Sequence, residues 1–387
     1  MLCAIALSMT LLVLPWGSAS AGAPSDLGAN AALKYWQAFA QLPKLTDAQE
    51  HKLKEEYLVM PLDTHVRETV TGADYAFRMM HRGAALPQCD WGLDYEEGVE
   101  LMLPHAQAAR MMSTLACLRA RIRFEEGHNA DALDDLVDAM TLGRHATRDG
   151  TLLTALINIG IEQRTGDTLA RYLPTLNAEV IRRLKARLGA LPPAGTLAEG
   201  VAIFEQKAGL DWLIRKVKEH KDPESLAAFL STYCGRGGDS PEQARARGRA
   251  FLEECGGTAD GVVKMAEETR PCYAMGARML ELPLDQCEKE FALEAKKRAG
   301  NPVFKTFFPP ISSIRLSQAR ADIYRALLAA ALDVQLEGPD ALKKHPDPVA
   351  GGPLEWVAFE GGFELHSRFH KPDDGKPWVL VVGQRGK

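Results

Sequence analysis

The stretch Asp90–Gly98 concentrates carboxylates in the way that a calcium-binding loop does. Asp90, Asp94 and Glu96 could offer oxygen ligands to one ion if the loop curled around it, although their order differs from that of an EF-hand loop. Asp94 followed three residues later by Glu97 also has the spacing of a helix-capping box, in which acids complement the positive end of a helix. We therefore predict that Asp94 caps a helix that runs through Met102 and beyond, and we predict no metal site.

Two histidines in helix-like sequence, His105 and His145, are the candidates for acid–base chemistry. A His side chain beside a carboxylate can act as a general base, and Glu162 on another predicted helix is the candidate carboxylate. A hydrolase that uses such a His–carboxylate pair is the alternative function that these residues leave open. The sequence contains no G-x-S-x-G elbow, P-loop, dinucleotide fingerprint or H-E-x-x-H motif.

Glu125-x-x-His128 has the spacing of one pair of di-iron ligands on a helix. A di-iron bundle needs two such pairs and two further Glu residues, whereas the sequence offers one pair and interrupts it at Gly127. We predict that His128 lies at the tip of a helical hairpin, and we predict no metal and no cofactor for this chain.

Composition is that of a globular protein: 387 residues, 46% hydrophobic and 25% charged, with a formal net charge of −5. This length is enough for one large core or for two smaller domains. Because the chain carries no basic excess, we predict no nucleic-acid partner.

The first residues have the features of an export signal. An apolar run, LCAIALSMTLLVLPW, precedes the small-residue pattern Ala19–Ala21, which is typical of a cleavage site. We predict a signal peptide at 1–21 and a secreted or periplasmic protein that begins near Gly22. No later stretch approaches the ~20 apolar residues of a spanning helix, so we predict no membrane span after cleavage.

Export would place the cysteines in an oxidising compartment. Cys234, Cys255, Cys272 and Cys287 lie in one turn-rich segment, and no pair has the C-x-x-C spacing of a zinc or redox site. The apolar residues of this segment are sparse and broken by turns, so we expect little local core. We predict two disulfides among these four residues, with all three pairings open. Cys117 falls inside a helical pattern and is predicted to be a buried thiol.

The elements that would position these side chains are mostly helices, from Asn30 to about Leu336. Apolar residues recur at the helical period through 105–126 and 129–145, and Gly127 separates the two segments, which indicates a helical hairpin. Asn129 or Asp131 is the predicted cap of the second helix. We predict further helices at 151–163 and 177–189, the second capped by Asn177. The fold class is therefore mainly α, with stacked helical hairpins that form a bundle or an irregular solenoid.

The last residues change character. A long helix is predicted after a cap at Ser312 or Ser313, followed by short strands at 356–359, 363–365 and 378–383, the first two of which form a hairpin. We divide the chain into a signal peptide (1–21), a helical domain (22–230), a cysteine-containing helical segment (231–311) and a C-terminal α+β module (312–387).

This C-terminal module resembles a known family. The long helix, then DPVAGGPLEW, GGFELHSR and an Asp-Asp-Gly stretch, is similar to the carboxyl-terminal part of type II secretion major pseudopilins. The amino-terminal helix that builds the pilus in that family is not present here. The resemblance implies an α+β module used as a domain rather than a filament subunit.

Stacked hairpins, a pseudopilin-like module and the lack of a recognisable catalytic set together favour a binding function. We predict a secreted or periplasmic, non-enzymatic scaffold that binds another protein or a cell-surface polymer.

Overall fold

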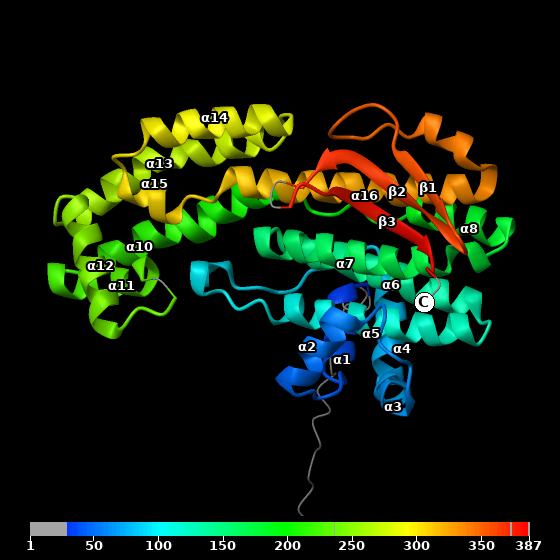
Figure 1. The fold of residues 1–387 in the computed structure, drawn as a ribbon. Coiled ribbons are helices and arrows are strands. Elements are labelled where there is room, and N and C mark those ends of the chain that lie inside the picture. The colour runs from blue at the N-terminus through cyan, green and yellow to red at the C-terminus, as the bar shows by residue number, and fades with distance from the viewer. Residues whose placement is uncertain (1–28, 236, 372–373, 386–387) are drawn as a thin grey trace, which may run out of the picture.

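The computed structural model describes residues 29–235, 237–371 and 374–385. Most of these residues are helical and a small antiparallel sheet lies near the carboxyl end, which confirms the predicted mainly α class with a C-terminal β-hairpin (Figure 1). The predicted signal peptide at 1–21 lies outside the described residues. Within them, no helix combines the length and the apolar character that crossing a bilayer would require.

Three helices form the centre of the molecule. The hairpin predicted from the sequence is present as α5 (Pro104–Glu125) and α6 (Asn129–Ala146), joined through Gly127. Gly127 has a φ of 80°, a conformation that glycine adopts at little steric cost. Helix α7 (Leu152–Tyr172) packs against both α5 and α6, and its Ile161 is fully buried.

Four short helices cover α5 and α6 on the amino-terminal side. They are α1 (Ala31–Phe39), α2 (Asp47–Glu56), α3 (Thr64–Gly72) and α4 (Asp74–Ala84). Their apolar side chains share one core with the hairpin, in which Phe77, Met80 and Met112 are fully buried.

A second group of helices lies at the end of the molecule away from α8 and the sheet, at the left of Figure 1. Its core holds apolar residues from Leu197 to Ile314, with Trp212 fully buried, so it extends beyond the predicted segment 231–311 on both sides. The group comprises α9 (Leu197–Glu199), the π-helix η4 (Gly200–Asp211), α10 (Trp212–Glu219), α11 (Pro223–Cys234), α12 (Pro241–Glu254), α13 (Ala259–Met279), α14 (Leu284–Lys297) and α15 (Pro302–Phe307).

Helix α16 (Ile311–Glu337) connects the two ends of the molecule. Its 27 residues span about 40 Å, and it begins in the core of the second group and ends beside α7, α8 (Ala178–Gly189) and the sheet. Helices α7 and α16 approach closely at Gly166, where an added Cβ would lie 2.9 Å from the Tyr324 ring.

The three-stranded sheet packs on α16 and α7. Its strands are β1 (Glu355–Phe359), β2 (Gly362–His370) and β3 (Pro377–Gly383), antiparallel and in that order. The turn between β1 and β2 holds Gly361 at a φ of 89°, a conformation that glycine adopts at little steric cost. The inner face is formed by buried apolar residues of β2 and β3: Phe363, Leu365, Leu380 and Val382.

The predicted helix starts are right in one place and wrong in two. Asn177 caps α8 as predicted, because its side chain accepts a hydrogen bond from the N–H of Val180 at 3.0 Å. Helix α6 follows His128 and helix α16 follows Pro310, and neither residue makes a side-chain cap bond. The predicted caps that the structure does not bear out are Asn129, Asp131, Ser312 and Ser313.

Candidate functional site

The two candidate histidines lie in one buried aromatic cluster. His105 is in the first turn of α5, where the Trp91 ring stacks on it with the centroids 4.5 Å apart. His145 is in the last turn of α6, where its Nδ1 lies 2.8 Å from the Tyr35 hydroxyl of α1. The cluster therefore joins the amino-terminal helices to the central hairpin.

His105 does have a carboxylate partner, but that partner is Asp149 and not the predicted Glu162. Nε2 of His105 lies 2.8 Å from Oδ2 of Asp149, and both side chains are 0% exposed. The backbone N–H of Thr151 at 2.8 Å and the hydroxyl of Thr154 at 2.5 Å donate to the same carboxylate and fix its position. A general base must reach the proton that it removes, and neither side chain of this pair is exposed, although Asp149 belongs to the wall of a pocket described below.

His145 has no carboxylate partner. Burial, helped by the positive charge of Arg148, lowers the pKa of His145 to about 4, so the ring is neutral at pH 7. As a neutral ring it accepts or donates one hydrogen bond with Tyr35 and holds α1 against α6. This is a structural role rather than a catalytic one.

Glu162 lies in a different place, on α7 between two arginines. The Nε of Arg144 lies 3.0 Å from one of its oxygens, and the Nε of Arg325 lies 2.7 Å from the other. Each carboxylate oxygen therefore already accepts a charge-assisted hydrogen bond, which leaves Glu162 poorly placed to act as a base. Arg144 and Glu162 thus form an ion pair, whereas the three candidates His105, His145 and Glu162 do not form one site.

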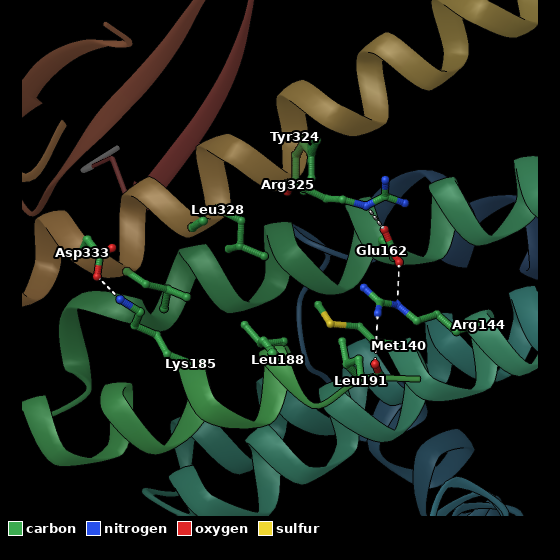
Figure 2. A pocket seen from close by; sticks show the side chains of 13 residues that line it. Met140, Arg144, Glu162, Lys185, Leu188, Leu191, Tyr324, Arg325, Leu328 and Asp333 are labelled. Atoms are coloured by element: carbon green, nitrogen blue, oxygen red, sulfur yellow. Dashed lines mark hydrogen bonds and ion pairs between the residues drawn. The ribbon is translucent and has the colours of Figure 1, made fainter. Parts of the chain in front are cut away.

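The two arginines and Glu162 close one end of a cavity of about 310 Å³ between α6, α7, α8 and α16 (Figure 2). We call this cavity the apolar pocket. Its other end carries Lys185 of α8, which forms an ion pair with Asp333 of α16. The wall between the charged ends is formed by Met140, Leu188, Leu191, Leu328 and Leu332.

Two more pockets adjoin the apolar pocket along α7. The polar pocket, of about 340 Å³, shares Arg144 and Arg325 with it as walls. The aromatic pocket, of about 510 Å³, shares Ala155 and Thr196 with the polar pocket and is named for its Tyr95 and Phe204. We refer to the three together as the α7 pockets, because residues of α7 line each of them.

The aromatic pocket is lined in part by the π-helix η4, which extends over 12 residues. Such helices are rare, mostly short, and frequent at functional sites. Two of the exposed apolar side chains of the described residues are at this pocket, Ile203 of η4 at 53% exposure and Tyr95 at 47%. Nothing in the periodicity of the sequence distinguished this segment from an α-helix.

The carboxylate-rich stretch Asp90–Gly98 contributes Tyr95 to that pocket. The predicted cap at Asp94 is confirmed, since its side chain accepts from the N–H of Glu96 at 3.0 Å, but its partner is Glu96 and not Glu97 of the predicted capping box. The element that it caps is a 3-10 helix, η1 (Tyr95–Glu100), and not the long helix predicted there, which begins only at Pro104. Among the described residues, no group of three or more His, Cys, Asp or Glu side chains gathers in a way that could hold a metal ion.

The prediction of two disulfides is wrong in this structure. Cys234, Cys255, Cys272 and Cys287 are all free thiols, and the last three are buried. They pack as apolar side chains in the core that runs from Leu197 to Ile314, so this segment has the core that the sequence was expected to lack. Burial also raises the pKa of the Cys255 thiol to about 12, which disfavours the thiolate that disulfide chemistry requires.

Sequence reasoning missed most of the residues that line the α7 pockets. They come from segments between 95 and 333 and form no motif. One signal was available: Glu162 stands in a helix that is apolar almost all round, and a charge in such a helix needs a partner. The sequence does not say that Arg325, 163 positions away, is that partner.

No protein-family model, no curated protein and no solved structure matches this chain. The resemblance of residues 312–387 to major pseudopilins therefore stays a prediction drawn from those residues.

Proposed function

We propose that this protein is a non-enzymatic binding scaffold whose α7 pockets hold an extended segment of a partner protein. The observation that carries the proposal is the row of three adjoining pockets along α7, with apolar, polar and aromatic walls in turn. Sites of this kind, mostly apolar with a few placed polar groups, are the usual form of a ligand site.

The spacing of the pockets suits a peptide chain. Ala155, shared by the aromatic and polar pockets, and Glu162, in the apolar pocket, are seven residues apart on α7, which is about 10 Å along the helix axis. About three residues of extended chain cover the same distance. Side chains of one short extended segment can therefore enter successive pockets.

The charges of the pockets favour a protein segment over a charged surface polymer. Five basic and five acidic residues line them, so no sign of charge dominates and a polyanion gains no net attraction. They are Arg144, Arg148, Lys185, Lys207 and Arg325, and Asp149, Glu162, Glu199, Asp322 and Asp333. A peptide presents the matching mixture of apolar side chains, carbonyl oxygens and N–H groups.

The hydrolase alternative finds less support in this geometry. Of the two candidate histidines, only His105 pairs with a carboxylate among the described residues, that of Asp149, and neither side chain is exposed.

We also propose export. The apolar run and the Ala19–Ala21 pattern support it, whereas the cysteines, which are free thiols, give it no support. Sequencing the amino terminus of the native protein tests export: we expect Gly22, and a chain that retains Met1 would contradict it.

The binding proposal is tested with a displayed library of random short peptides. The wild-type protein should enrich peptides that carry apolar residues, and Ala329→Trp should lose them. Ala329 is exposed on α16 at the edge of the apolar pocket, so a Trp there fills the pocket without entering the core.

Ala292→Trp is the matched control, because Ala292 is also an exposed helical alanine and lines none of the α7 pockets. It should enrich the same peptides as the wild type. Failure to enrich any peptide, or equal enrichment by Ala329→Trp, would overturn the proposal, as would binding of a polysaccharide alone.

A further inference from the structure

Strand β1 has an open edge. It lies at the outside of the sheet and, among the described residues, pairs only with β2. Residues Glu355–Ala358 are exposed, and among them Trp356 is 39% and Val357 45% exposed. An exposed apolar strand at a sheet edge is a ready surface for pairing with another strand.

The hairpin turn determines which backbone groups of β1 are free. Phe359 and Gly362 flank the two-residue turn, and a pair in that position exchanges both of its hydrogen bonds. Because this pattern alternates along the strand, the N–H and C=O groups of Glu355, Val357 and Phe359 point to β2. Those of Trp356 and Ala358 point away from the sheet.

This open edge carries one charged residue, Glu355, but lacks three other features that usually block an edge. Strand β1 has neither a Lys nor a Pro, and its pairing with β2 is regular throughout. The other edge strand, β3, begins at Pro377, and its pairing with β2 is irregular between His366 and His370. The β1 edge is therefore the better template for an added strand.

We propose that a second copy of this chain adds its own β1 to this edge, antiparallel, around a twofold axis at Val357. In this register Trp356 stands opposite Ala358 of the second copy, and the same pair recurs across the axis. Both residues have outward-pointing backbone groups, so each of the two pairs exchanges both hydrogen bonds. Val357 then faces Val357 of the second copy in a non-hydrogen-bonded pair, where side chains lie closest.

The side chains of β1 complement one another in that register. Trp356 is placed beside the small Ala358 of the second copy, which leaves room for the indole ring. Glu355 is placed beside Phe359 of the second copy, on the face where the Arg385 guanidinium lies 5.5 Å from the Phe359 ring centre. Arg385 also forms an ion pair with Glu364 of β2 in its own copy, so the exposed carboxylate of one copy joins this pair of the other, twice per dimer.

The test uses the contact between Val357 of one copy and Val357 of the other. Val357→Lys and Val357→Glu each place like charges across the twofold axis, so each variant alone should be monomeric by analytical ultracentrifugation. The wild type should be a dimer, and an equimolar mixture of the two variants should recover one. The control is Val381→Lys, because Val381 is 39% exposed on β3 and plays no part in the pairing; it should leave the dimer intact.

Cross-linking tests the register itself. Cα atoms of a non-hydrogen-bonded pair are about 4.5 Å apart, within the range that a disulfide spans. Under mild oxidation Val357→Cys should therefore give a dimer in which mass spectrometry finds residue 357 linked to residue 357. A wild-type protein that stays monomeric at high concentration, a dimer that persists in Val357→Lys, or loss of the dimer in Val381→Lys would each overturn the proposal. The outcome is independent of whether the α7 pockets bind peptides.

Discussion

At the scale of single residues, the buried polar groups hold helices together. Glu162 joins α6 to α16 through Arg144 and Arg325, and His105 joins α5 to the start of α7 through Asp149. Each of these groups has a partner from another segment, as burial of a polar group requires, although the Nδ1 atom of His105 has no hydrogen-bond partner among the described residues.

His145 makes the stability of the fold depend on pH. Its pKa is about 4 in the folded protein, because of burial and then Arg148, against an ordinary value near 6.5 in the unfolded chain. Between these values the unfolded chain binds the extra proton, so stability falls as pH falls from 6.5 to 4 and is fully retained above 6.5. The shift corresponds to about 3 kcal/mol of unfolding free energy lost by pH 4.

The measurement compares urea denaturation of the wild type and His145→Gln from pH 7 to pH 4. The Gln side chain does not titrate and can still accept a hydrogen bond from Tyr35. The free energy of unfolding of the wild type should therefore fall more steeply with decreasing pH than that of the variant. Parallel pH dependences of the two proteins would contradict the assignment.

At the scale of elements, one carboxylate anchors the sheet to the loop that precedes it. Asp347 is 3% exposed, and its oxygens accept hydrogen bonds from the Ser367 hydroxyl at 2.5 Å and the Arg368 N–H at 2.8 Å in β2. The N–H groups of Val349 and Ala350 donate to it at 2.9 Å. Burial alone would raise the pKa of Asp347, but these hydrogen bonds outweigh burial and lower it.

Asp347→Ala leaves those donors without a partner and should lower the free energy of unfolding by about 2–4 kcal/mol. Asp340→Ala is the control. The Asp340 side chain is 88% exposed and pairs only with Lys343 among the described residues, so its loss should cost less than about 0.5 kcal/mol. Urea denaturation measures both, and equal losses would show that Asp347 has no anchoring role.

Helices and strands could be predicted from the sequence where a local pattern of residues determines them. The hairpin of α5 and α6 follows from apolar spacing and Gly127, and the strands follow from alternation around Gly361. The candidate site could not be predicted from the sequence, because it depends on contacts between residues far apart in the chain, such as Glu162 and Arg325. The disulfide prediction was wrong for a related reason: buried residues such as Trp212, outside the cysteine segment, supply its core.

At the scale of the whole molecule, α16 joins the two helical groups and supplies one wall of the apolar pocket. No residue of the sheet lines any of the α7 pockets. Pairing of two copies through β1 therefore does not change the residues that line the α7 pockets of either copy. A dimer of this kind would present two peptide sites and gain avidity for a partner that carries two copies of the bound segment.

The most direct test of the binding account is the dissociation constant of one selected peptide, measured by isothermal titration calorimetry with three proteins. We expect Ala329→Trp to weaken binding at least about tenfold relative to the wild type, because the indole occupies the apolar pocket. Ala292→Trp, with the same substitution on α14, should change the constant by less than about twofold. Equal dissociation constants for the wild type and Ala329→Trp would place the peptide elsewhere and contradict the account.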